Sequence, residues 1–284
     1  MWTHILTDTY RISEKREAHR YMLGALTKVV HRAPSSCYSA TGMQREKTPF
    51  APQFESITNT TQPTQMSEEL LKATIALYSK GNPGLENVGC QRWLVDSAAK
   101  RYIWRLLYGL IPASGMKILD IGGGISSMTC YLAENHQYQL ADVLVHDSAD
   151  VAHRLAEKYG FFLHQCDWAT LPYFESDVII AVDLFPNVDQ RLSEFLYWAE
   201  NRAPLVILLL TFYPFSRSYL AKRVDTEEFL TVRAWGKSEL SRCLADYYGE
   251  TNCDDAIDRS IASDSLFPNG RRCITMTSKK VGQK

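Results

Sequence analysis

The stretch MKILDIGGGISSMTCYLAE, residues 116–134, joins an apolar run, three consecutive glycines and a helix-compatible segment. The apolar run ends in Asp120, and the glycines occupy positions 122–124. A strand, a glycine turn and a helix in this order are typical of a nucleotide-cofactor site, because glycine lets the backbone approach a ligand closely. The stretch therefore predicts an α/β fold with a cofactor at the carboxyl end of this strand.

The charge of Asp120 indicates which cofactor the glycine loop suits. In dinucleotide-binding folds the loop and the helix N-terminus present N–H groups to a pyrophosphate. An aspartate two residues before the first glycine would repel that group. S-adenosylmethionine has no phosphate and carries an ammonium and a sulfonium, so Asp120 can attract the ammonium while Gly122 and Gly124 allow close approach. The sequence therefore favours a cationic cofactor and argues against a nicotinamide-dependent reductase.

Composition limits the remaining classes of protein. With 284 residues, 45% of them hydrophobic, the chain can form one large α/β domain and an appendage. Its net charge of −1 provides no basic field, so no nucleic-acid partner is expected. Its seven cysteines form no CxxC pair, which predicts neither a disulfide framework nor a metal site. The longest apolar run is too short to span a bilayer and the N-terminus lacks a signal-peptide pattern, so a cytoplasmic protein without a membrane partner is expected.

Residues 1–111 are predicted to form an N-terminal helical extension. Apolar residues at helical spacing predict helices over 14–31, 67–80 and 89–110. A polar arm without periodicity separates the first two helices, over about 33–65. We expect this extension to act as a lid over a cleft or to exchange with a second subunit in a homodimer.

Residues 112–284 are predicted to form a Rossmann-like domain, because short strands alternate with helices as in a parallel sheet. The predicted strands are 116–121, 141–146, 161–166, 177–182 and 204–212. The predicted helices lie near 127–135, 149–159, 188–201 and 237–248. Near the end, Asn269-Gly270 is a hairpin signal that adds an antiparallel strand. The whole pattern predicts a doubly wound, mostly parallel seven-stranded sheet with an antiparallel C-terminal hairpin strand and an N-terminal helical lid.

The segment DIGGG with its flanking strand resembles motif I of the class I S-adenosylmethionine-dependent methyltransferases, D/E-x-G-x-G-x-G. Ser126 departs from the pattern at the third glycine, and it can instead cap the following helix. The resemblance covers roughly 112–212 well and 213–284 by topology only, and it does not include 1–110.

The resemblance implies cofactor contacts at the ends of three further strands. Asp147, 23 residues after Gly124, would bind the ribose hydroxyls. In HQCDWATLPY, Asp167 would lie near the adenine amino group and Trp168 would pack on the ring; in DVIIAVDLFPNVDQ, residues 183 and 184 would flank the methionine portion. The expected cofactor-binding residues are Asp120, Gly122, Gly123, Gly124, Asp147, Ser148, Asp167, Trp168, Asp183 and Leu184. Considered one at a time, Asp147 also fits a helix N-cap and Asp167 a turn residue.

Methyl transfer from a sulfonium is an in-line displacement, so orientation and exclusion of water can supply most of the catalysis. A general base is needed only if the acceptor must lose a proton, and no histidine follows position 164. Asp183 and Tyr213 are the catalytic candidates; other possible bases are Asp225, Glu227, Glu228 or an N-terminal histidine. The candidate substrate contacts are Tyr78, Arg101, Tyr102, Arg217 and Arg223. Aromatic and arginine side chains in 213–235 would bind an anionic or sugar-like acceptor, unless the segment is a solvated, mostly helical excursion.

The sequence thus predicts an S-adenosylmethionine-dependent methyltransferase acting on O or N of a small polar metabolite. The alternatives are a protein or RNA methyltransferase and a catalytically silent S-adenosylmethionine-binding protein.

Overall fold

The structure is a computed structural model that describes residues 50–58, 66–112, 114–144, 147–186, 188–222, 229–249 and 251–281. The predicted helix over 14–31 and most of the predicted arm lie outside these residues.

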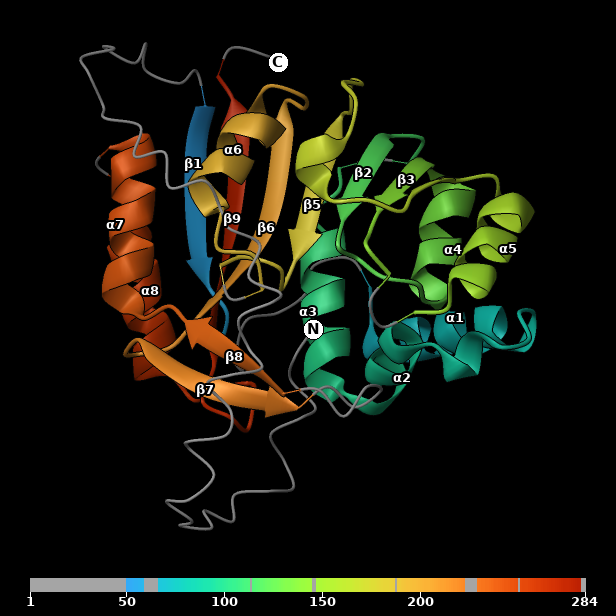
Figure 1. Cartoon of the computed structure of the whole chain (residues 1–284), viewed down its shortest axis with the longest axis horizontal. Helices are drawn as coiled ribbons and strands as arrows, with labels where there is room; N and C mark the ends of the chain where they lie inside the picture. Colours follow the sequence, from blue (N-terminus) through green and yellow to red (C-terminus); the bar gives the residue numbers. More distant parts are fainter. Residues whose placement is uncertain are drawn as a thin grey trace, which may run out of the picture.

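Seven strands form one sheet with the order β1-β9-β6-β5-β2-β3-β4 (Figure 1). The strands are β1 (Phe50–Ser56), β2 (Lys117–Ile121), β3 (Gln137–Ala141), β4 (Phe162–His164), β5 (Val178–Val182), β6 (Leu205–Phe212) and β9 (Arg272–Lys280). Strands β2 to β6 pair in parallel, whereas β9 runs antiparallel to both of its neighbours. The predicted mostly parallel, seven-stranded sheet with an antiparallel C-terminal strand is therefore confirmed.

Strand β1 lies within the predicted polar arm, in which no strand was expected at residues 50–56. It pairs with β9 from Phe50 opposite Lys280 to Ser56 opposite Ile274, and so forms one edge of the sheet. Phe50 and Phe54 lie four residues apart, which places both on one face of a strand. Both are buried, Phe54 in the main core. Two apolar residues in a polar stretch are too short a pattern to predict a strand without its partner.

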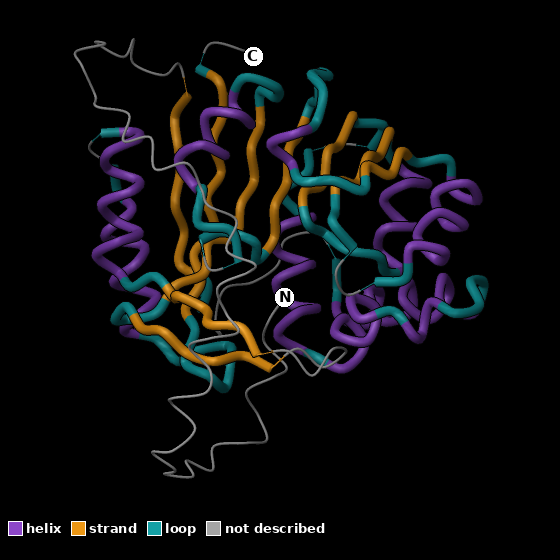
Figure 2. Tube along the Cα trace, in the orientation of Figure 1, coloured by secondary structure: helices purple, strands orange, loops and turns teal. Residues whose placement is uncertain are grey.

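Helices cover both faces of the sheet, as the purple and orange tubes of Figure 2 show. The helices are α1 (Glu68–Lys80), α2 (Gly89–Asp96), α3 (Ala98–Tyr108), α4 (Ser127–Asn135), α5 (Ala149–Tyr159), α6 (Leu192–Glu200), α7 (Lys237–Tyr248) and α8 (Cys253–Ala262). Successive strand residues point to opposite faces, so Ile179 packs in a core with α6, α7 and α8, and Ile180 in a core with α3, α4 and α5. Among the described helices, none has the length and apolarity that a membrane crossing requires.

Two predicted elements of the central region differ from the structure. The helix predicted over 89–110 is divided at Ser97, whose backbone is extended and whose hydroxyl accepts the Lys100 N–H at 3.2 Å to cap α3. The second strand of the parallel sheet is β3, not 141–146. In β3, Tyr138 and Leu140 alternate with more exposed residues, and this short alternation was less visible than the apolar run that follows it.

The C-terminal half also differs from the prediction. The segment after β6 forms an antiparallel hairpin, β7 (Arg217–Lys222) with β8 (Phe229–Ala234), so the mostly helical alternative is wrong for the described residues. Asn269-Gly270 lies in a turn that leads from α8 into β9. The partners of β9 are β6 and β1 and not the preceding segment, so the expected C-terminal hairpin is wrong while its antiparallel strand is present.

Candidate functional site

The glycine loop joins β2 to α4 and is compressed from two sides. A Cβ on Gly123 would lie 2.5 Å from Oδ2 of Asp120, so only glycine fits under that carboxylate. Gly124 has φ +69°, and a Cβ there would lie 2.1 Å from the Cys90 Sγ of α2. Ser126 caps α4 through a hydrogen bond from the Met128 N–H at 3.2 Å. The expected capping role of Ser126 is thereby confirmed, and Gly123 and Gly124 make room for the side chains of Asp120 and Cys90.

Asp120 is buried at the end of β2 with one oxygen paired and the other free. Tyr108 and Tyr138 donate their hydroxyls to Oδ2 at 2.5 and 2.9 Å. Oδ1 is buried and has no hydrogen-bond partner among the described residues. Burial raises the pKa of Asp120 to about 6, against the opposing effect of the two tyrosine hydrogen bonds. A buried carboxylate oxygen without a donor indicates a place where a ligand donor binds.

Two hollows meet at Gly122, along the carboxyl ends of the parallel strands. The first lies between the glycine loop and helices α2 and α3, and it is lined by Cys90, Trp93, Lys100, Trp104, Tyr108, Asp120, Gly122, Gly123, Ser126 and Val182, among others. The second has a volume of about 510 Å³ and is lined by Ile121, Gly122, Ala141, Asp142, Val143, Cys166, Asp167, Trp168, Leu184, Val188, Asp189, Gln190 and Arg191. This position is where open α/β sheets bind ligands, and the second hollow is large enough for a nucleoside.

Asp142 follows β3 directly and lines the second hollow. The family resemblance had instead pointed to Asp147 as the acid after this strand that would bind the ribose hydroxyls. The Oδ2 of Asp142 accepts the Gly124 N–H at 3.0 Å, and its Oδ1 accepts the Leu144 N–H at 2.7 Å. Each oxygen retains a lone pair for a further donor. Burial raises the pKa of Asp142 to about 6. Asp142 was not among the predicted residues because the second strand was predicted at 141–146, four residues too late. With the strand at 137–141, Asp142 would have been the first acid after it.

Asp147 connects helix α2 to the glycine loop. Its two oxygens accept the N–H groups of Cys90 at 3.3 Å and Ile125 at 2.6 Å. Ser148, and not Asp147, caps α5, through the Val151 N–H at 3.4 Å. Neither residue is among those that line the two hollows. The structure thus places Asp147 beside the loop and Ser148 at the start of α5, and neither lines the cleft.

The predicted adenine contacts lie together in the wall of the second hollow. Asp167 forms an ion pair with Arg191 at 2.6 Å and accepts the Ala169 N–H at 2.9 Å. The Trp168 indole donates to Asp189 at 2.8 Å, and the Arg191 guanidinium lies 4.7 Å from the Trp168 ring centre. Trp168 is buried in the core, and the Arg191 guanidinium covers one face of its ring.

Asp183 is held in a buried group of three charges. Its Oδ1 accepts a hydrogen bond from the Arg271 Nη1 at 2.5 Å, and its Oδ2 forms an ion pair with Lys100. Burial would raise the pKa of Asp183, but Arg271 and Lys100 outweigh it and hold the pKa well below its usual range. Lys100 lines the first hollow, and Leu184 lines the second, against Gly122. The sequence did not indicate Lys100 or Arg271, which lie 83 and 88 positions from Asp183.

Tyr213 is buried at the end of β6, beside this charged group. The Arg217 guanidinium stacks on its ring at 3.8 Å. Arg223 and the further candidate bases Asp225, Glu227 and Glu228 lie outside the described residues.

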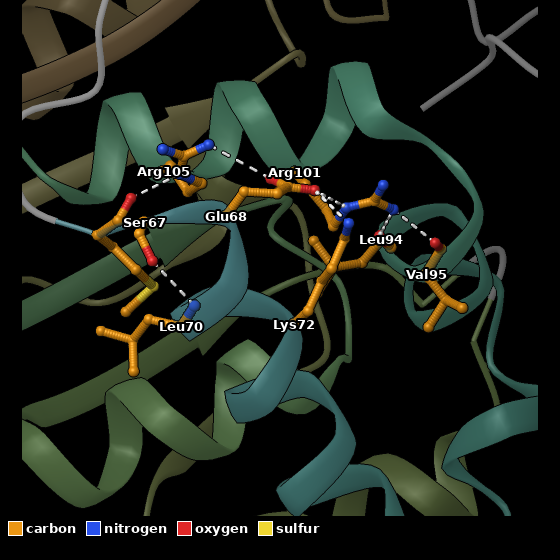
Figure 3. A network of polar contacts seen from close by, with 9 residues as sticks. Ser67, Glu68, Leu70, Lys72, Leu94, Val95, Arg101 and Arg105 are labelled. Carbon is orange, nitrogen blue, oxygen red and sulfur yellow. Dashed lines mark hydrogen bonds and ion pairs between the residues drawn. The ribbon is translucent and has the colours of Figure 1, made fainter.

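The three predicted substrate contacts of the N-terminal extension have other partners. Arg101 donates to Glu68 at 2.7 Å and to the Val95 carbonyl at 2.5 Å, in a network that joins α3 to the start of α1 (Figure 3). The Tyr78 hydroxyl donates to Glu134, and the Tyr102 hydroxyl donates to the Thr58 carbonyl at 3.0 Å. The residues that line the two hollows do not include Tyr78, Arg101 or Tyr102. The structure therefore does not bring these three together with the cofactor candidates.

No family model matches the sequence, and no curated protein matches it. Similar solved structures include the Burkholderia thailandensis 1,6-didemethyltoxoflavin-N1-methyltransferase with bound S-adenosylhomocysteine, at 17% identity and a TM-score of 0.46, over 78% of this chain and 93% of that one. Another is the magnesium protoporphyrin IX methyltransferase of Synechocystis with bound SAM, at 15% identity and a TM-score of 0.38, over 76% and 86% of the two chains. Coclaurine N-methyltransferase follows at 13% identity and a TM-score of 0.40, over 79% and 77%. Because these similarities are low, the functional proposal rests on the residues of this chain.

Proposed function

We propose that the chain is an S-adenosylmethionine-dependent methyltransferase that acts on an oxygen or nitrogen of a small polar metabolite. The free Oδ1 of Asp120 is the observation that carries this proposal. A buried carboxylate oxygen needs a donor, and an ammonium supplies both donors and the opposite charge. A pyrophosphate at the same place would set negative charge against Asp120. The glycine loop therefore suits the methionine end of S-adenosylmethionine and not a dinucleotide.

The two hollows would bind different parts of this cofactor, the second hollow the adenosine and the first the methionine portion. Asp142 would accept the ribose hydroxyls, and the second hollow, with Asp167 and Trp168 in its wall, would enclose the adenine. In the first hollow, Lys100 would bind the methionine carboxylate. Among the described residues that line this hollow, Lys100 is the one with a positively charged side chain. The bound cofactor supplies an electrophilic methyl group on a sulfonium.

The residues of the chain contribute orientation and exclusion of water. An in-line displacement gains most from fixed geometry, which Asp120, Asp142 and Lys100 would impose on the cofactor from three sides. Asp183, with its low pKa and two cationic partners, is a poor general base. We therefore assign Asp183 to positioning Lys100 and Arg271, and we retain Tyr213 as the candidate beside the acceptor.

Isothermal titration with S-adenosylmethionine, S-adenosylhomocysteine and NADH tests the cofactor directly. Both sulfur compounds are expected to bind and NADH is not. Binding of NADH alone would overturn the proposal. Tritium-labelled cofactor then separates the alternatives: label in protein or RNA would replace the metabolite, and tight binding without any labelled product would mean a silent cofactor-binding protein.

A further inference from the structure

A cluster of cationic and aromatic side chains adjoins the proposed methionine pocket. Arg271 and Lys100 share one carboxylate, that of Asp183. Arg217 adds a third positive charge where it stacks on Tyr213. Arg217 is exposed and also donates to the Asn269 carbonyl at 3.2 Å, so the buried charges are Arg271, Lys100 and Asp183. A buried arginine that shares its carboxylate partner with a second cation favours a further anionic ligand.

Arg271 carries the specific evidence for a ligand. It is 5% exposed, and its Nη1 is occupied by Asp183 at 2.5 Å. Its Nε and Nη2 are buried and have no hydrogen-bond acceptor among the described residues. Its guanidinium is otherwise fixed against the Phe267 ring, 4.0 Å from the ring centre. Buried N–H groups in native proteins are rarely left without an acceptor.

The geometry of the free atoms indicates the kind of anion. Nε–H and Nη2–H form one edge of the planar guanidinium fork and point in the same direction. That edge matches the two oxygens of a carboxylate in a bidentate pair. Nη1, which holds Asp183, lies on the other side, so both interactions can exist together.

Tyr213 adds a second free polar group at the same place. Its hydroxyl is buried beside the Tyr219 hydroxyl and has no acceptor at hydrogen-bond geometry within the described part of the chain, and the side chain is 2% exposed. Tyr213 and Arg271 are close enough to interact electrostatically, and so are Tyr219 and Arg271. A tyrosine hydroxyl beside a guanidinium edge can donate to the same carboxylate.

We propose that the methyl acceptor is a carboxylate-bearing small molecule whose carboxylate binds the free edge of Arg271 beside Tyr213. This inference rests on the proposed function, because the acceptor of a methyl group is what binds past the exits of β5 and β6. The hairpin of β7 and β8 lies next to the carboxyl end of β6 and borders this approach (Figure 1).

The test uses the full chain, tritium-labelled S-adenosylmethionine and a small-molecule cell extract divided by anion exchange into retained and unretained fractions. Label is expected in the retained fraction, and treating that fraction with phosphatase beforehand should not change it. Label only from the unretained fraction overturns the inference while the proposed function stands. Loss of labelling after phosphatase treatment means a phosphate and also overturns it. Binding of the cofactor without label in either fraction rejects methyl transfer and this inference together, whereas failure to bind the cofactor rejects the proposed function.

Variants connect the result to Arg271. Arg271→Gln is expected to lower kcat/KM for the retained acceptor about a hundredfold, mainly through KM, because a buried charge partner is removed. Tyr213→Phe leaves the Asp183 ion pairs intact and should lower it about three- to tenfold, which keeps the test valid if Arg271→Gln fails to fold. Arg242→Gln, on an exposed part of α7, is the matched control with unchanged kinetics. All three variants should bind S-adenosylmethionine as the unaltered chain does. Equal kcat/KM values for Tyr213→Phe and the control would refute the proposal, and so would unchanged kinetics of Arg271→Gln.

Discussion

At the scale of single residues, Asp120 links cofactor recognition to pH. Its pKa is raised to about 6, first by burial, so in the free protein the carboxyl takes up a proton as the pH falls below 6. The protonated form loses the charge that attracts an ammonium. The affinity for S-adenosylmethionine should therefore fall about tenfold for each pH unit below 6 and be nearly constant between 7 and 8. Titration calorimetry at pH 5, 6, 7 and 8 measures this dependence.

Asp120→Asn provides the control for that pH dependence. The amide has a similar shape but no charge, so the variant should bind about ten- to a hundredfold more weakly at pH 7.5. Its affinity should fall less steeply below pH 6 than that of the unaltered chain, and the remaining fall is expected from Asp142, whose pKa is also raised to about 6. If the fall is as steep in Asp120→Asn as in the unaltered chain, the role given to Asp120 is wrong.

Asp142 and Asp147 are expected to separate binding from stability. If Asp147 bound the ribose hydroxyls, as the family resemblance implies, Asp147→Ala would lose about ten- to a hundredfold in cofactor affinity. Because Asp142 lines the second hollow, we now expect that loss from Asp142→Ala. Asp147→Ala should instead lower the free energy of unfolding by about 2 kcal/mol, since the buried N–H groups of Cys90 and Ile125 lose their acceptor.

Calorimetry with S-adenosylhomocysteine and urea unfolding, applied to both variants, decide between these assignments. A large loss of affinity in Asp147→Ala at unchanged stability would restore the ribose role to Asp147.

The residues that sequence could identify are those whose role depends on neighbours in the chain. Asp120 and the glycines were predicted because a strand, a turn and a helix succeed one another within 19 residues of sequence. The role of Ser126 as a helix cap could also be predicted from sequence, because capping depends on the next three residues. The pairing of Lys100 and Arg271 with Asp183 could not be predicted, because Asp183 is distant from both in sequence and only the folded sheet brings them together.

At the scale of elements, the junction between α1 and α3 depends on Glu68. Its carboxylate pairs with Arg101 at 2.7 Å and with Arg105 at 3.3 Å, and Arg105 also donates to the Met66 carbonyl at 2.6 Å (Figure 3). Glu68→Gln keeps the shape and removes the charge, so it should lower the free energy of unfolding by about 1–2 kcal/mol. Urea unfolding measures the loss.

Glu69→Gln is the matched control for this junction. Glu69 is exposed in the same first helical turn, so both variants change the charge near the helix N-terminus equally. Only Glu68→Gln also weakens the contacts with α3. Equal losses in the two variants would show that the effect comes from the helix end and not from the junction.

The elements themselves were predictable where one periodicity continued long enough. Helices α1, α4, α5 and α7 and strands β2, β5 and β6 lie within about two residues of their predicted bounds, since each has a regular apolar pattern. The division between α2 and α3 was missed because apolar spacing continues through Ser97, and only the cap marks the break. Strand β1 was missed because its stability comes from β9, more than 200 positions later in the sequence.

At the scale of the whole molecule, β1 tests the predicted division into 1–111 and 112–284. If the two segments folded independently, shortening a buried side chain of β1 would lower the stability of residues 1–111 only. The Phe54 side chain, however, belongs to the main core and meets the Tyr248 ring edge-on, with ring centres 6.5 Å apart. We therefore expect Phe54→Ala to lower the stability of the entire sheet by about 3–5 kcal/mol, in one cooperative transition.

Differential scanning calorimetry, together with hydrogen exchange of β2 and β6, measures whether the whole sheet responds to Phe54→Ala. The exposed neighbour Gln53→Ala serves as the control, because it changes β1 without opening a cavity, and its cost should stay within about 0.5 kcal/mol. Two separate transitions, with only the first displaced by Phe54→Ala, would establish the division at 111. A single displaced transition would make β1 part of the domain that carries the cofactor cleft, because a strand that stabilises β9 also stabilises β6 and the cationic cluster at its end.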